Sequence, residues 1–310
     1  MSPATMKAIS VHAFGGPEVL LVDDVPVPQP AEGQVLVRVH AAGVNPADWK
    51  MRSGAFQKFR PIPLPWIPGL EGAGVVEAVG PGVTQFKPGQ AVFGSFSGAY
   101  AEFALAQAGD LQLKPAQLTF AEAAAIPVGA LTAWGEVVDA AQVKPGQRVL
   151  VHGAAGGVGL FAVQFAHQKG AYVIGTTSTP NLDFVRLLGA DEVIDYTVGP
   201  FEKAVHDLDA VNDTVGGDLP ERSLSVLRKG GIFVTVAAQL PEDFGKAQGV
   251  RGVRGMRTAP ANLADICAMV EEGKLKAVVS KVFPLSQARQ AHELSQTGHG
   301  RGRIVLQIIR

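Results

Sequence analysis

A glycine-rich turn between an apolar run and a periodic apolar segment is the clearest chemical signal in the chain. Residues 147–159 read QRVLVHGAAGGVG, and the run Arg148–His152 is typical of a fully buried parallel strand. A strand, a glycine-rich turn and a helix N-terminus together present backbone N–H groups and a positive dipole end to an anion. In this context the anion is most often the pyrophosphate of a dinucleotide, although glycines that serve only the turn are the alternative. The spacing Ala154-x-Gly156-x-x-Gly159 has alanine in the first place and keeps the two glycines needed for close approach and packing.

The end of the next strand indicates which dinucleotide is bound. In folds that prefer NAD, an acidic residue at this point binds the ribose 2′-hydroxyl. Here the strand reads AYVIGTTSTPN, and Thr177, followed by Ser178, stands where the acid would be. Small hydroxyl groups leave space and donors for a 2′-phosphate and remove a carboxylate that would repel it. We therefore predict NADPH rather than NADH, with ordinary polar turn residues as the alternative interpretation.

Cysteine and histidine usage argues against a metal centre. Cys267 is the single cysteine, which excludes an intramolecular disulfide and a cysteine-cluster metal site. It shares a helical face with Leu263, Ile266 and Val270, so we expect it in the core. The seven histidines show no ligand spacing such as H-E-x-x-H. We expect no metal.

Length and composition bound the class of protein. The 310 residues suggest about two domains, each with room for its own core. Charged residues make up 18% of the chain and the net charge is −1, which gives no electrostatic case for nucleic acid or an anionic membrane. The N-terminal residues form no apolar signal core, and the longest apolar stretch, 121–141, is broken by two glutamates and a proline. We expect a cytoplasmic protein with no membrane span.

The elements that must position the turn fall into a strand-rich part and a part in which strands alternate with helices. Together the two parts predict an α/β protein. From residue 7 to 104 the chain is rich in strand signals separated by Gly- and Pro-bearing turns. The predicted strands there are 7–12, 19–23, 34–42, 72–79 and 100–105. This half is interpreted as an irregular all-β domain.

From residue 118 the chain alternates helices and buried strands. An Ala-rich helical stretch begins near Thr119, a plausible N-cap with Glu122 completing a capping box. The alternation favours a doubly wound parallel sheet. Its predicted strands are 148–152, 171–176, 192–195, 209–213 and 231–237, and its predicted helices are 157–169, 181–188, 200–206 and 219–228. A helix predicted over 261–273 and a strand predicted over 303–309 follow, and this last part of the chain again resembles the first, strand-rich part.

Five stretches resemble a known family in the family's own order. They are GGPEVL (15–20), AAGVNPADWKMRSG (41–54), PGLEGAGVVEAVGPGV (68–83), VHGAAGGVG (151–159) and GRIVL (302–306). The chain resembles the medium-chain dehydrogenase/reductase superfamily, specifically its zinc-free quinone oxidoreductase (zeta-crystallin-like) and alkenal reductase branch. The resemblance implies a GroES-like irregular β-barrel catalytic domain, residues 1–122 and 259–310. It also implies an inserted Rossmann NADP-binding domain, residues 123–258.

The resemblance also implies which residues form the site. Asn45, Asp48 and Lys50, in the NPxDxK stretch, line the nicotinamide and substrate end, and Lys50 is the best candidate for positioning the cofactor and stabilising an oxyanion. Relatives often carry a lysine at the position of Leu182, which this chain lacks. The implied cofactor-binding residues are Pro46, Ala47, Thr132, Ala155, Gly156, Gly157, Val158, Thr177, Ser178, Tyr196, Thr214, Val236, Ala237, Ala238 and Gln239. Asp48 as a helix cap and Lys50 as an exposed lysine are the structural alternatives.

The expected activity follows from these residues. GLEG (69–72) stands where zinc-dependent relatives carry a metal-binding His-Glu pair, so metal-assisted alcohol oxidation is not expected. Without a metal, the hydride acceptor should already be activated, as a quinone or an α,β-unsaturated carbonyl is. We therefore predict an NADPH-dependent, zinc-independent reductase of such small molecules. The alternatives are a non-catalytic NADPH-binding sensor or structural protein, and an enoyl-thioester reductase.

The family also places a sheet-edge strand at residues 245–257, where it pairs with its copy in a second subunit. This loop carries Arg251, Arg254 and Arg257. The resemblance therefore implies a homodimer. A solvated face is one alternative, and contact of the three arginines with a phosphate or an acidic substrate is another.

Overall fold

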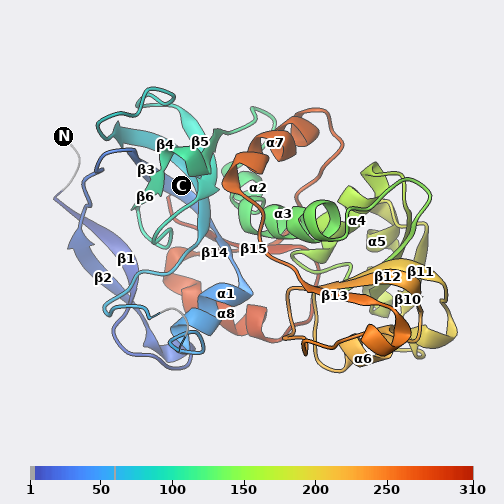
Figure 1. The fold of residues 1–310 in the computed structure, drawn as a ribbon. Helices are drawn as coiled ribbons and strands as arrows, with labels where there is room; N and C mark the ends of the chain where they lie inside the picture. Colours follow the sequence, from blue (N-terminus) through green and yellow to red (C-terminus); the bar gives the residue numbers. More distant parts are fainter. Residues whose placement is uncertain (1–3, 59–60, 310) are drawn as a thin grey trace.

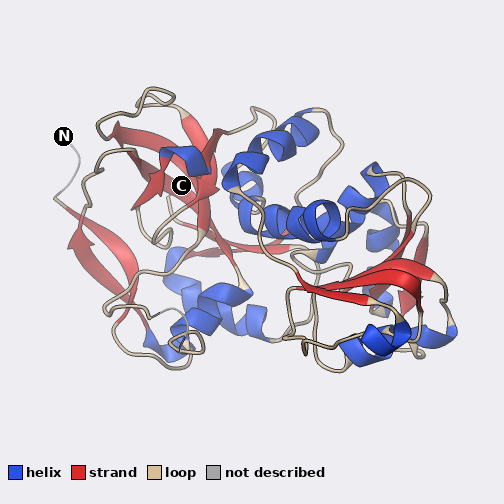
Figure 2. Ribbon diagram, in the orientation of Figure 1, coloured by secondary structure: helices blue, strands red, loops and turns tan. Residues whose placement is uncertain are grey.

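The computed structural model describes residues 4–58 and 61–309; residues 1–3, 59–60 and 310 of the predicted domains lie outside that description. Within the described residues the chain forms two large sheets and a small antiparallel pair. Figure 1 shows the sheets in separate lobes, with α2, α3 and α7 between them. Figure 2 shows that strands dominate one lobe, whereas helices pack around the sheet of the other.

The first large sheet joins segments from both halves of the chain. Its strand order is β14-β15-β3-β4-β5-β7, with β6 also paired to β3. The strands are β3 (Gln34–Val44), β4 (Glu71–Val79), β5 (Ala91–Ser95), β6 (Phe103–Gln107), β7 (Leu111–Leu113), β14 (Val279–Pro284) and β15 (Arg303–Gln307), and the small pair is β1 (Thr5–Val11) with β2 (Leu20–Pro26). β15 runs antiparallel to β3 with Ile304 opposite Val44. This pairing brings the end of the chain to the start of helix α1.

The second large sheet is entirely parallel. Its order is β10-β9-β8-β11-β12-β13, the doubly wound pattern that reverses direction next to the first strand. The strands are β8 (Arg148–His152), β9 (Tyr172–Thr177), β10 (Glu192–Asp195), β11 (Leu208–Asp213), β12 (Leu227–Thr235) and β13 (Arg251–Arg254). The predicted fold class is confirmed. The strands of the two sheets lie on either side of the predicted domain division, whose boundaries stay a prediction.

The helices join the two sheets through one continuous core. They are α1 (Pro46–Arg52), α2 (Phe120–Ala124), α3 (Pro127–Trp134), α4 (Gly159–Gln168), α5 (Leu182–Leu187), α6 (Leu219–Ser223), α7 (Leu263–Glu271) and α8 (Ala288–Gln296). One apolar cluster runs from Phe93 of β5 through Leu131 of α3 to Val151 of β8. The predicted capping box is present at α2: Glu122 N donates to Thr119 Oγ1 (3.2 Å), and Thr119 N donates to Glu122 Oε2 (2.8 Å).

Several local predictions were wrong where tertiary contacts overrode local preference. The helix expected over 219–228 ends at Ser223, because Leu227 already pairs with Leu208 of β11. The helix expected over 200–206 is a short 3₁₀ turn, 201–203, followed by Asp207 at φ 54°. Helices α1 and α8 and strands β5, β7 and β14 were not predicted. Cys267 is half-buried rather than core, and its Sγ faces the carbonyl of Leu113 at 3.8 Å.

A buried glutamate lies in the π-helical stretch 135–140 that continues α3. Glu136 is 0% exposed, and within the described part of the chain neither carboxylate oxygen has a hydrogen-bond partner. Burial raises the pKa of this carboxyl well above its usual value of 4.5, and the charge of Asp213 raises it further. Both effects favour the protonated form of Glu136 in the folded protein. With the pKa raised on folding, its contribution to stability is fully present below about pH 4.5 and is lost as the pH rises.

The Glu136→Gln variant should consequently gain stability relative to the wild type as the pH rises. Glutamine cannot ionise, so we expect a difference in the free energy of unfolding of about 1–3 kcal/mol at pH 8 that shrinks toward pH 5. Urea unfolding at both pH values measures it. The control is Glu242→Gln, at an exposed position, whose difference should not vary with pH. Parallel pH profiles for the wild type and Glu136→Gln would contradict the buried, protonated state.

Candidate active site

The glycine-rich turn lies between β8 and α4 and can accept no side chain at Gly159. A Cβ at Gly159 would lie 2.1 Å from the carbonyl oxygen of Gly153. Gly153 itself has φ 68°, a conformation that favours glycine. Ala154 N donates to the Thr176 carbonyl at 3.0 Å, which fastens the turn to the end of β9. The strand, turn and helix predicted from the sequence are therefore present.

The end of the chain also contacts this turn. Gly302 N donates to the Ala155 carbonyl at 2.8 Å. The next residue, Arg303, points its guanidinium at Gly157, where a Cβ would lie 2.7 Å from Arg303 Nη1. Arg303 is 3% exposed, and its Nε has no hydrogen-bond partner among the described residues. A buried cation with an unused donor thus lies against the predicted phosphate-binding turn.

Arg303 belongs to a buried polar cluster with Glu71 and Asn45. Its Nη2 donates to Asn45 Oδ1 at 2.8 Å and also to Glu71 Oε1. Glu71 Oε1 further accepts from Asn45 Nδ2 (2.8 Å), and Oε2 accepts from the backbone N of Val128 (2.7 Å). All three side chains are at most 3% exposed. The carboxylate of the GLEG stretch is therefore fully engaged by protein donors.

Asp48 connects this cluster to helix α1. Its Oδ2 accepts from Asn45 N at 2.8 Å, while Asp48 N donates to the Asn45 carbonyl at 3.0 Å, which caps α1. Its Oδ1 accepts from Gly69 N at 3.3 Å. Asp48 is 0% exposed, and burial raises its pKa to about 7, with the nearby Glu71 charge adding to the shift. Through these hydrogen bonds Asp48 fixes the positions of Asn45 and Pro46 at the start of α1.

A second row of buried groups ties α1 to α8. The Tyr100 hydroxyl donates to Asp48 Oδ2 at 3.5 Å and lies 3.2 Å from His292 Nε2. On the other side of the ring, His292 Nδ1 lies 3.2 Å from Arg52 Nη1. Burial and, to a smaller extent, the Arg52 charge lower the pKa of His292 to about 3, so this imidazole is neutral at pH 7. These groups fix α1, and with it the predicted nicotinamide end of the site.

Lys50 and Trp49 extend from α1 on a less buried face. Lys50 Nζ lies 5.5 Å from the centroid of the Trp49 ring, and Trp49 Nε1 donates to Ser295 Oγ of α8 at 3.2 Å. Lys50 is half-buried. Of the three predicted catalytic residues, only Lys50 therefore keeps an accessible polar end.

The predicted cofactor residues of the parallel sheet follow the carboxyl ends of its strands, where such sheets bind ligands. Thr177 ends β9 and is 3% exposed, and its carbonyl accepts from Tyr196 N at 3.1 Å. Thr214 Oγ1 donates to the His152 carbonyl at 2.8 Å, beside the glycine-rich turn. After β12, the backbone N–H groups of Ala237 and Ala238 both donate to Thr235 Oγ1 at 3.1 Å. Val236–Gln239, Ser178 and the turn residues 155–158 share this edge.

Thr132 comes from α3 rather than from a strand end. Its Oγ1 donates to the Val128 carbonyl at 2.7 Å, and Val128 N in turn donates to Glu71. Pro46 and Ala47 are the first two residues of α1, directly after Asn45. The structure therefore links the predicted residues of α1 and α3 through Glu71.

Sequence reasoning missed Arg303, Glu71, Tyr100, His292 and Arg52 as parts of the site. A charged residue inside an otherwise apolar strand was the available signal: Arg303 begins RIVLQ, and Glu71 begins EGAGVVEAV. Such a charge is rarely buried unless it is paired. The sequence does not show which charge pairs with which.

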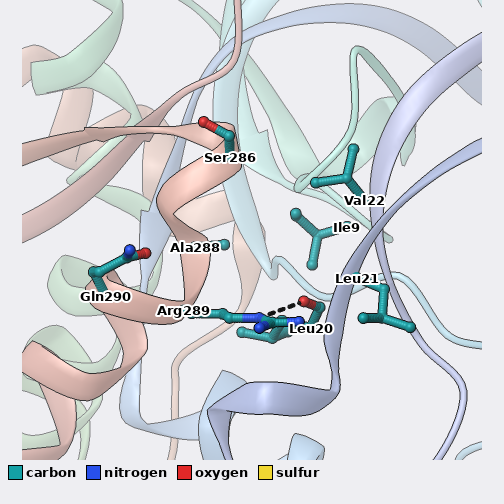
Figure 3. A pocket seen from close by; sticks show the side chains of 8 residues that line it. All are labelled: Ile9, Leu20, Leu21, Val22, Ser286, Ala288, Arg289 and Gln290. Carbon is teal, nitrogen blue, oxygen red and sulfur yellow. Dashed lines mark hydrogen bonds between the residues drawn. The ribbon is translucent and has the colours of Figure 1, made fainter.

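A surface pocket lies away from these residues. Figure 3 shows it between Leu20, Leu21 and Val22 of β2 and the Ser286–Gln290 segment that leads into α8. Arg289 Nε donates to the Leu20 carbonyl at 2.9 Å on its wall. No predicted site residue lines it.

The described residues contain neither a cluster of metal-ligating side chains nor a membrane-spanning helix. No group of three or more His, Cys, Asp or Glu side chains there is placed to hold a metal ion. In the same residues, no helix is both long and apolar enough to cross a membrane.

Comparison with known families matches both halves of the chain. Residues 31–133 match the model described as alcohol dehydrogenase GroES-like domain, and residues 188–306 match that described as zinc-binding dehydrogenase. The quinone oxidoreductase of Sus scrofa is 37% identical over 308 residues, which cover 93% of each chain. The chain belongs to the medium-chain dehydrogenase/reductase superfamily. It is an oxidoreductase of that superfamily, with a GroES-like domain and a Rossmann-like parallel sheet.

Two further proteins are similar to almost the whole of this chain. The 2-methylene-furan-3-one reductase of Solanum lycopersicum is 36% identical, with 98% of this chain and 79% of that protein covered. A mycobacterial protein solved in complex with NADPH superimposes with a TM-score of 0.89 at 33% identity, covering 98% of this chain and 100% of that one. The predicted resemblance to the superfamily is confirmed.

Proposed function

We propose that this protein is an NADPH-dependent, zinc-independent reductase of quinones or α,β-unsaturated carbonyls. The names of its relatives, a quinone oxidoreductase and an enone reductase, support the substrate class. The observation that carries the proposal is the Arg303–Glu71 pair. Arg303 lies against the phosphate-binding turn, and it engages the carboxylate at the position where zinc-dependent relatives carry their metal-binding pair.

The residues present fit a bound dinucleotide. Gly157 leaves room for the Arg303 guanidinium, and the unpartnered Arg303 Nε offers a donor toward the turn. Residues 155–158 and Arg303 would hold the pyrophosphate, while Thr177, Ser178 and Tyr196 would line the adenosine ribose and its phosphate. Thr132 and Val236–Gln239 would contact the nicotinamide side. The NADPH-bound relative supports the choice of cofactor.

The bound cofactor supplies a hydride, and the protein must orient the acceptor and exclude water. The capped α1, held by Asp48 and by the bonds of Tyr100 to Asp48 and His292, would keep Asn45 and Lys50 in place at the nicotinamide end. The ammonium group of Lys50 would position the cofactor and stabilise the negative oxygen that develops on an enone. A reduced quinone needs no such donor, because solvent protonates its dianion. Asp48, being fully buried, would act through Asn45 rather than on the substrate.

The assembly and location belong to the same proposal. β13 lies at the edge of the parallel sheet, as expected of a strand that pairs with its copy in a homodimer. We keep the predicted division into residues 1–122 with 259–310 and 123–258, and a cytoplasmic location. No nucleic acid partner is proposed, given the net charge of −1.

The first test is oxidation of NADPH by EDTA-treated protein, followed at the absorbance of the reduced cofactor. An ortho-quinone and a simple enone are offered in parallel, with NADH as the control cofactor. We expect turnover with NADPH, undiminished by EDTA, and the better acceptor would choose between the two substrate classes. Tight NADPH binding with no turnover of either acceptor would overturn the reductase and favour a sensor or structural role. Turnover restored only by added zinc would overturn zinc independence.

A further inference from the structure

The ribose end of the proposed cofactor site lacks an obvious cation. The 2′-phosphate carries the charge that distinguishes NADPH from NADH, yet none of Thr177, Ser178 and Tyr196 has a cationic side chain. Leu182 stands where relatives often carry a lysine. Hydroxyl groups alone give weaker bonds to phosphate than charge-assisted donors do. A phosphate-binding cation must therefore come from elsewhere in the fold, if NADPH is preferred.

Arg301 lies in the loop that leads into β15 of the other large sheet, and it contacts α5, the helix that follows the proposed ribose-binding residues. It precedes Gly302, whose N–H is bonded to the Ala155 carbonyl of the glycine-rich turn. Its guanidinium lies over the ring of Phe184, with Cζ 5.5 Å from the ring centroid. Phe184 is in α5, and a single 3₁₀ turn separates Ser178 from the start of that helix. Arg301 thus spans from the pyrophosphate-binding turn to the helix that follows the ribose-binding residues.

The charge of Arg301 is available for a ligand. No carboxylate forms an ion pair with it within residues 4–58 and 61–309, and the nearest acid of α5, Asp183, is already paired with Arg186 at 2.7 Å. Its side chain is exposed. Stacking on Phe184 restrains the guanidinium plane and leaves its N–H edge free, which is the arrangement that suits bidentate phosphate binding.

We propose that Arg301 is a specificity-determining residue that binds the 2′-phosphate of NADPH and replaces the missing lysine of α5. The inference rests on the proposed NADPH dependence. It assigns cofactor selectivity to the loop before β15: Arg301 of this loop reaches the ribose phosphate, while Arg303, the first residue of β15, faces the pyrophosphate. Substitution of Arg301 should then weaken the binding of NADPH only, whereas substitution of Arg303 should weaken the binding of both NADPH and NADH.

The test compares the dissociation constants of NADPH and NADH, measured by nucleotide fluorescence, for the wild type and the Arg301→Gln and Arg301→Lys variants. Arg301→Gln should weaken NADPH binding about 10- to 100-fold and leave NADH binding within twofold. Arg301→Lys should recover part of the lost NADPH affinity, because lysine restores the positive charge but not the paired N–H donors of the guanidinium. Arg38→Gln, which removes an exposed arginine from β3 of the other large sheet, is the matched control and should change neither constant more than twofold.

The outcomes separate this inference from the proposed function. A wild-type protein that binds NADH as tightly as NADPH would overturn the cofactor choice and the role of Arg301 together. A wild-type preference for NADPH that survives Arg301→Gln would overturn only the role of Arg301. Equal losses for both nucleotides would also overturn it, because they would place the arginine on the shared part of the cofactor. Thermal unfolding of each variant should match the wild type, since Arg301 is exposed.

Discussion

Replacing Arg303 by methionine is expected to destabilise the protein by about 3–5 kcal/mol and to abolish tight NADPH binding. The destabilisation arises because the Glu71 carboxylate, which is 0% exposed, would keep its buried charge and lose its cationic partner. The loss of binding arises because the three atoms nearest to a Cβ at Gly157 all belong to Arg303, so the variant removes the cation that lies against the turn. Urea unfolding and NADPH titration of the purified variant measure the two effects.

The double variant Glu71→Gln with Arg303→Met separates them. Removing both charges should recover most of the unfolding free energy, because a neutral amide can still bond to Asn45 and Val128. NADPH affinity should stay low. If the double variant regained affinity as well as stability, Arg303 would be a structural residue and not part of the cofactor site. A single variant as stable as the wild type would contradict the buried pair itself.

Replacing Gly159 by alanine is expected to have the second largest effect. The added Cβ would lie 2.1 Å from the Gly153 oxygen, 2.8 Å from its carbonyl carbon and 2.9 Å from Ala154 Cα. All three are backbone atoms, so no side chain can rotate away, and the turn must move relative to α4. We expect a loss of about 1–3 kcal/mol in stability. NADPH affinity should fall at least about tenfold, which corresponds to about 1.4 kcal/mol.

The matched control is Gly199→Ala. A Cβ at Gly199 meets no atom within 4 Å, and its φ lies outside the left-handed range. We expect its stability and NADPH affinity to stay near the wild-type values. Gly159→Ala protein that bound NADPH normally would show that the turn does not carry the pyrophosphate.

Local patterns were enough to predict the strand, turn and helix of the proposed cofactor site. The strand Arg148–His152, the turn after it and helix α4 are contiguous in the chain, so their geometry depends on neighbouring residues. The hydroxyls at Thr177 and Ser178 follow the next strand in the same way. The capping box at Thr119 is equally local, since its two residues are three positions apart. The boundaries that were wrong, at Ser223 and Leu227, lie where a distant strand competes with a local helix.

The order of the strands and the pairing of the buried charges could be determined only from the tertiary structure. Arg303 and Asn45 are 258 positions apart, and Arg303 and Glu71 are 232 apart. They meet because β15 pairs with β3 so that Ile304 lies opposite Val44, which sets the neighbouring residues side by side. By itself, the sequence determined the fold class and the glycine-rich turn between β8 and α4, because both follow from local periodicity and glycine spacing. Only the folded sheet decided which charges are paired, because pair formation depends on strand register between the two ends of the chain.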